Sequence, residues 1–141
     1  YTTTLAVEHM KKNKWGRVIN MASISVKEPL NYLALSNSIR SALTTWSKTL
    51  ANQIGSHNIT VNNVLTGYFN TERIKELNLE KAKKMNIELD QVYQSMEQSV
   101  PMKRIGEPHE FANLVTFLAS ELSSYINGIN IPIDGGLLKS L

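Results

Sequence analysis

The sequence predicts an α/β protein with a parallel sheet, because helical and strand patterns alternate along its length. The helical stretches place apolar residues three and four positions apart, whereas the strand stretches are short and rich in β-branched residues. Chain length adds a limit: 141 residues bury a single core, and no linker divides them. We therefore expect one domain, or part of one.

Seven elements are expected along the chain. They are a helix over 4–12, a strand over 17–21, a long helix over 33–55, a strand over 59–65, a charged helical segment with short breaks over 71–99, a helix over 107–120 and a strand over 129–133. The first helix carries the apolar residues Leu5, Val7 and Met10 and ends at Gly16. The strands read RVINM, ITVNNVL and INIPI.

The long helix has the most regular apolar pattern. Its apolar residues are Leu35, Ile39, Leu43, Trp46, Leu50 and Ile54. Gly55 is suited to end this helix. The helix over 107–120 opens with Pro108, which fits a first turn because the N–H that Pro lacks would have no partner there.

Composition argues against several classes of function. The chain has no Cys, and His9, His57 and His109 match no ligand spacing, so we expect no metal site. No run is long and apolar enough for a membrane span, and the two Lys-rich clusters lack interleaved aromatic residues, so neither membrane nor nucleic acid is an expected partner. The first residues carry no targeting signal, which favours the cytoplasm, and they begin without Met inside a helical pattern, which indicates truncation.

Four segments carry recognisable patterns, in the order GRVINMAS, NITVNNVLTGYFNT, PMKRIGEPHEFANLVTFLAS and SSYINGINIPIDGG. They resemble the short-chain dehydrogenase/reductase family, and most closely its 3-oxoacyl-[acyl-carrier-protein] reductase branch. The resemblance implies that residues 1–141 form the C-terminal half of one doubly wound, Rossmann-type domain, with three strands and their helices. The family's Gly-rich turn for the cofactor pyrophosphate does not occur, which implies about four strands upstream.

The family's catalytic spacing falls on unusual residues. In the family, a Ser at the strand end is followed thirteen residues later by Tyr and four residues after that by Lys; here these positions are Ser23, Ser36 and Arg40. The family Ser stabilises the carbonyl, the Tyr transfers the proton, and the Lys lowers the Tyr pKa and binds the ribose. An aliphatic alcohol is far less acidic than a phenol, whose pKa is ~10, and Arg presents a planar fork in place of the compact ammonium.

Two interpretations of this segment stay open. In the first, the family's pocket is retained at Ser23, Ser36 and Arg40, and proton transfer is altered. In the second, Ser36 and Arg40 face solvent on a helix surface. Tyr32, four residues before Ser36, either points its phenol toward the same cleft or anchors the preceding loop.

The resemblance also implies a cofactor, NAD or NADP, which the sequence does not distinguish. Arg40, Gly67, Phe69 and Thr71 stand at the family's cofactor-binding positions, and Tyr68 would be a wall of the pocket. The alternative for this turn is a simple helix cap, and both can hold at once.

The segment at about 71–100 resembles a long substrate lid, which favours a bulky or apolar carbonyl or alcohol substrate. Its alternative is a helical hairpin that packs on a neighbouring subunit. The sequence favours a homodimer or homotetramer, because two sets of residues offer apolar surface for self-association. One set is Leu43, Trp46 and Leu50; the other is Phe111, Val115 and the last strand.

The expected function is that of an NAD(P)-dependent oxidoreductase that reduces a carbonyl or oxidises an alcohol with an atypical proton donor. The alternative is a catalytically silent protein of the same fold that acts through nucleotide binding or subunit association.

Overall fold

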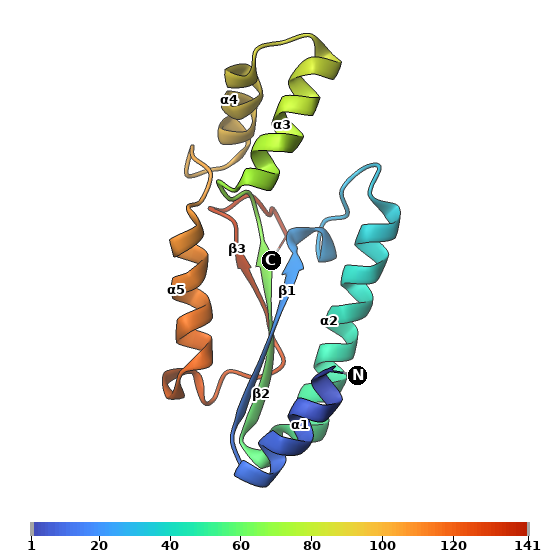
Figure 1. The fold of residues 1–141 in the computed structure, drawn as a ribbon, viewed down its shortest axis with the longest axis vertical. Coiled ribbons are helices and arrows are strands. Elements are labelled where there is room, and N and C mark those ends of the chain that lie inside the picture. The colour runs from blue at the N-terminus through green and yellow to red at the C-terminus, as the bar shows by residue number, and fades with distance from the viewer. Residues whose placement is uncertain (1, 141) are drawn as a thin grey trace.

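The computed structural model describes residues 2–140 and contains three parallel strands with helices on both sides (Figure 1). The strands are β1 (Gly16–Ser23), β2 (Ile59–Thr66) and β3 (Asn130–Ile133), in the spatial order β1-β2-β3. Seven of the eight residues of the central strand β2 are buried. The predicted α/β class and its three-stranded parallel sheet are confirmed.

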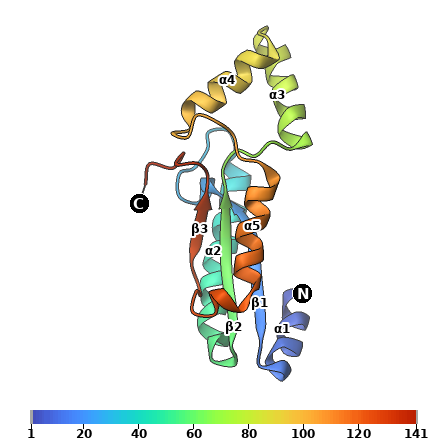
Figure 2. The ribbon, with the colours of Figure 1, turned by 90° about the vertical axis from the view of Figure 1, so that its left-hand side faces the viewer.

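Five α-helices surround the sheet. They are α1 (Thr2–Asn13), α2 (Ala34–Ile54), α3 (Glu72–Met85), α4 (Leu89–Ser99) and α5 (Pro108–Ala119). Helices α1 and α2 lie on one side of the sheet, and α5 lies on the other (Figure 1). Figure 2 shows that α3 and α4 project beyond the carboxyl ends of the strands. The expected elements are all present, with ends that differ by a few residues at most.

The charged helical segment is a hairpin, because the chain reverses between α3 and α4. Asn86 ends α3 in the left-handed region, with φ 52°. Glu88 then begins α4 with a capping box that it shares with Gln91. Ala82 and Val92 are buried between the two helices, which are packed on each other.

Helix α2 turns only the C-terminal part of its apolar pattern toward the sheet. The buried residues of α2 are Thr44, Ser47, Ala51 and Ile54, which are mostly small and let the helix approach β2 closely. Leu35 is 76% exposed, Ile39 60% and Trp46 43%. The helical periodicity was correct, but the sequence did not show that the stripe is exposed in its first half, whereas Leu50 and Ile54 at its other end pack in the core.

A row of asparagines holds the three strands in register. Asn20, Asn63 and Asn130 are aligned partners on β1, β2 and β3. Asn20 Nδ2 donates to Asn63 Oδ1 (3.2 Å) and to Ser47 Oγ on α2 (2.8 Å), and Asn63 Nδ2 donates to Asn130 Oδ1 (2.8 Å). A shift of the strand register by one residue would break these hydrogen bonds. The asparagine row therefore fixes which residues meet at the carboxyl ends of the strands.

One outer edge of the sheet is β1, which pairs only with β2 in the described part of the chain. Met21 on this strand is 64% exposed. Natural proteins normally cover or protect an unpaired sheet edge of this kind. No helix within residues 2–140 is long and apolar enough to cross a bilayer.

Candidate active site

The carboxyl ends of β1 and β2 bring Ser23 beside Thr66, its partner in the strand register. Ser23 is half-buried, and its Oγ accepts a hydrogen bond from the backbone N–H of Ser25 (3.1 Å). This contact caps the short 3₁₀ turn that follows β1 and holds the Ser23 side chain in one orientation. Its hydroxyl hydrogen stays free to donate, since the oxygen is the acceptor here.

Ser36 and Arg40 lie one turn apart near the start of α2. Arg40 Nε lies 3.4 Å from Ser36 Oγ, a long hydrogen bond that leaves the guanidinium other orientations. Both residues are half-buried, and within residues 2–140 no carboxylate lies within ion-pair distance of Arg40. They line a groove of about 430 Å³ on α2, which we call the helix groove. Its residues are Leu35, Ser36, Ile39, Arg40 and Leu43.

A second groove, of about 390 Å³, lies where the turn after β2 meets α3 and α5. We call it the turn groove. Its residues are Met21, Arg40, Thr66, Gly67, Phe69, Thr71, Arg73, Ile74, Pro108 and Phe111. The four residues expected to bind a cofactor, Arg40, Gly67, Phe69 and Thr71, all line this one groove. Ser23 and Ser36 do not line it, and Arg40 is common to both grooves.

The turn from Gly67 to Thr71 is held in place by contacts on both sides. The Gly67 N–H donates to the Ile133 carbonyl (3.0 Å), and a Cβ at position 67 would lie 2.6 Å from the Cβ of Asp134. Phe69 meets Phe111 edge to face, with ring centroids 5.8 Å apart. The backbone here comes close to β3 because Gly67 has no side chain.

Thr71 caps α3, because its Oγ1 accepts a hydrogen bond from the Ile74 N–H (3.3 Å). The interpretation of Thr71 as a helix cap is therefore correct, and it leaves the role in ligand binding open. The same hydroxyl keeps its own hydrogen for a ligand in the turn groove. Phe111, which we expected at a subunit interface, packs against Phe69 within the chain.

Tyr32 lies away from both grooves. It is fully exposed, and its φ of 64° places it in the left-handed region, in the loop before α2. The Asn37 side chain fixes part of that loop by donating to the Leu30 carbonyl (2.9 Å). In this chain the Tyr32 phenol does not approach Ser36 or Arg40, since it points into solvent.

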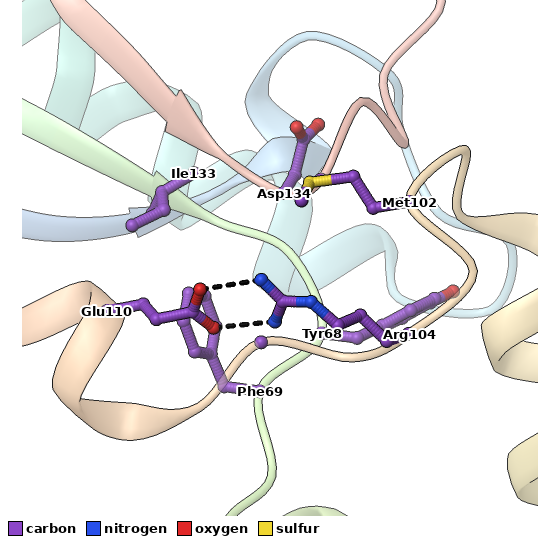
Figure 3. A pocket seen from close by; sticks show the side chains of 9 residues that line it. Tyr68, Phe69, Met102, Arg104, Glu110, Ile133 and Asp134 are labelled. Carbon is purple, nitrogen blue, oxygen red and sulfur yellow. Dashed lines mark hydrogen bonds and ion pairs between the residues drawn. The ribbon is translucent and has the colours of Figure 1, made fainter.

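A smaller cavity of about 150 Å³ adjoins the turn groove at Phe69 (Figure 3). In this cavity the Arg104 guanidinium donates two parallel hydrogen bonds, of 2.7 Å each, to the Glu110 carboxylate. Glu110 also accepts from the Glu107 N–H (2.8 Å) and so completes the capping box of α5. The pKa of Glu110 is lowered from 4.5 to about 2, mainly by the hydrogen bonds from Arg104 and next by the hydrogen bond from the Glu107 N–H.

This pair predicts a pH-dependent stability. Because the Glu110 pKa is lower in the folded state, its stabilising effect is complete above pH 4.5 and is lost as the pH falls toward 2. Glu110→Gln in the full-length protein should lower the melting temperature near neutral pH, and this deficit should shrink on acidification through that window. Melting curves across the pH range measure it, with the exposed Glu80→Gln as control. A deficit that stays constant down to pH 2 would contradict the assignment.

Comparisons with known proteins agree with this architecture. The family model described as enoyl-(acyl carrier protein) reductase matches residues 1–138. NADPH-dependent reductase BacG of Bacillus subtilis is 38% identical over 132 residues, which are 94% of this chain and 51% of BacG. The 3-oxoacyl-[acyl-carrier-protein] reductase MabA of Mycobacterium tuberculosis is 33% identical over 94% of this chain and 49% of MabA.

Solved structures give the same result. YwfH, described as an NADPH-dependent reductase involved in bacilysin biosynthesis, superposes with a TM-score of 0.88 at 37% identity, over 94% of this chain and 50% of YwfH. L-sorbose reductase from Gluconobacter frateurii, solved with NADPH and L-sorbose, gives 0.89 at 34% identity, over 96% and 52%. The chain belongs to the short-chain dehydrogenase/reductase family, and it spans about half the length of the relatives it matches.

Proposed function

We propose that the full-length protein is an NAD(P)-dependent oxidoreductase that reduces a carbonyl or oxidises an alcohol. The observation that carries this proposal is the turn groove, where Arg40, Gly67, Phe69 and Thr71 come together. The groove lies at the carboxyl ends of parallel strands, where ligands bind in open α/β sheets, and its volume is in the usual range for such sites. The residues present therefore fit a nicotinamide cofactor, which would supply the hydride when bound.

The chain's own residues would handle the substrate oxygen and its proton. The Ser23 hydroxyl, oriented by the Ser25 N–H, would donate a hydrogen bond to the carbonyl oxygen. Arg40 would bind ribose hydroxyls with its guanidinium. Ser36 Oγ would deliver the proton to the oxygen as it gains negative charge, and would take a proton back from solvent afterwards.

One feature of the relatives and one feature of this chain extend the proposal. BacG and YwfH are both NADPH-dependent reductases, which favours NADPH over NADH for this protein. The α3–α4 hairpin stands above the carboxyl ends of the strands, as a substrate lid would, and favours a bulky substrate (Figure 2). We also propose that the protein acts in the cytoplasm as a homodimer or homotetramer, for which the exposed Leu35, Ile39 and Trp46 of α2 offer apolar surface.

The second candidate is a catalytically silent protein that binds a nucleotide or associates with a partner subunit. The observation that favours it is that the family's Tyr position is Ser36 and that Tyr32, the phenol considered in its place, is fully exposed.

NADPH oxidation by the full-length protein, measured with a panel of ketones and 3-oxoacyl esters, separates the two candidates. The oxidoreductase should convert at least one of these carbonyls to its alcohol. Ser23→Ala should then lower kcat by on the order of a hundredfold, the effect of removing one donor to a developing oxyanion, with the Kd of NADPH unchanged. NADPH binding without any turnover would support the silent protein. A failure to bind NADPH or NADH would contradict the oxidoreductase, and of the second candidate it would leave only association with a partner subunit.

A further inference from the structure

Arg73 lines the turn groove, but the proposed function gives it no role. It lies in the first turn of α3 and reaches the groove from the side of the hairpin, whereas Arg40 reaches it from α2. Two arginines from separate elements thus line a single groove. Among the groove's residues, all within the described part of the chain, none is Asp or Glu.

The only carboxylate that pairs with Arg73 among residues 2–140 lies outside the groove. Arg73 Nη1 lies 3.3 Å from Glu76 Oε2, with side chains 71% and 63% exposed. An ion pair this exposed contributes little to stability, because water screens both charges. An anionic group inside the groove can therefore replace Glu76 as the partner of Arg73 at little cost.

The rest of the groove is mainly apolar. Met21, Phe69, Ile74 and Phe111 supply carbon surface between the polar groups. A ligand that sits against these side chains loses part of its water, which strengthens any charge-assisted hydrogen bond to a guanidinium. The chemistry that fits is an apolar or aromatic body with a negatively charged end, since Arg binds carboxylate and phosphate with two parallel bonds.

We propose that Arg73 binds an anionic group, a carboxylate or a phosphate, of the ligand in the turn groove. This inference rests on the proposed function for the identity of the groove. The anion has two possible sources: the carboxylate of an oxo acid substrate, or a phosphate of the dinucleotide.

The test measures equilibrium binding to the full-length protein, so that it does not depend on turnover. The probes are phenylpyruvate and 2-oxooctanoate, the methyl ester of each, and NADPH. The variants are Arg73→Gln and Arg73→Lys, with Lys75→Gln as the matched control, because Lys75 is an exposed cation on the same helix outside the groove. Arg73 is itself mostly exposed, so its substitution should leave the fold intact.

If the substrate supplies the anion, Arg73→Gln should raise the Kd of an oxo acid on the order of tenfold and leave its ester and NADPH within about twofold. If the cofactor supplies it, the Kd of NADPH should rise by a similar factor. In either case Arg73→Lys should recover part of the affinity, and Lys75→Gln should have no effect.

Unchanged affinities for acids and NADPH in Arg73→Gln would overturn the proposal, as would an equal loss in Lys75→Gln. A wild type that binds neither acid, with NADPH affinity insensitive to Arg73→Gln, would overturn it too. Absence of NADPH oxidation would count against the proposed function alone, because the binding result is read independently of catalysis.

Discussion

Ser36→Tyr together with Arg40→Lys should raise ketone reduction by the full-length protein at least tenfold, since a placed general acid is typically worth ~10²–10⁴-fold. The double change puts a phenol beside a compact ammonium at the spacing that the family uses. The helix groove that Ser36 lines has a volume of about 430 Å³, so the larger side chain has room. Initial rates of NADPH oxidation with a fixed ketone, at saturating cofactor, measure the gain.

The single variants serve as controls for this prediction. Ser36→Tyr alone should gain less than the double variant, because the planar fork of Arg40 does not reproduce an ammonium beside the phenol. Arg40→Lys alone should gain nothing. If the double variant binds NADPH normally and is no faster than the wild type, the missing phenol is not what limits the reaction. A rapid wild type that loses its activity on Tyr32→Phe would instead assign the proton to Tyr32.

Arg40→Ala should weaken NADPH binding by about 1.5–3 kcal/mol, roughly tenfold to a hundredfold in Kd, which is the usual loss for hydrogen bonds to a charged group. The effect should be large because Arg40 is half-buried between the two grooves and is not held by any carboxylate among residues 2–140. Titration of the full-length protein with NADPH, followed by fluorescence, measures it.

Lys48→Ala is the matched control for Arg40→Ala. Lys48 is an exposed cation on the same helix, lines neither groove, and donates to the Gly128 carbonyl (2.9 Å). It should leave the Kd of NADPH within about twofold, since a surface charge contributes little. Equal losses in the two variants would mean that the general positive field of α2, and not a contact with Arg40, holds the cofactor.

The sequence alone determined the order and type of the elements, because these depend on local patterns. Apolar residues at intervals of three and four predicted α2, and β-branched runs predicted β1 and β2. The resemblance to the family also pointed to Ser23, Ser36 and Arg40 as candidate site residues, because the family's spacing can be counted along the chain.

Only the tertiary structure decided which distant residues share a groove. Arg73, Met21 and Phe111 come from three separate elements, and no local pattern places them beside Gly67. Periodicity likewise showed that α2 has an apolar stripe but not what covers it: small residues such as Ser47 and Ala51 face the sheet, and Leu35 and Ile39 stay exposed. Burial depends on which partner surface meets a helix face, and that is a property of the whole packing arrangement.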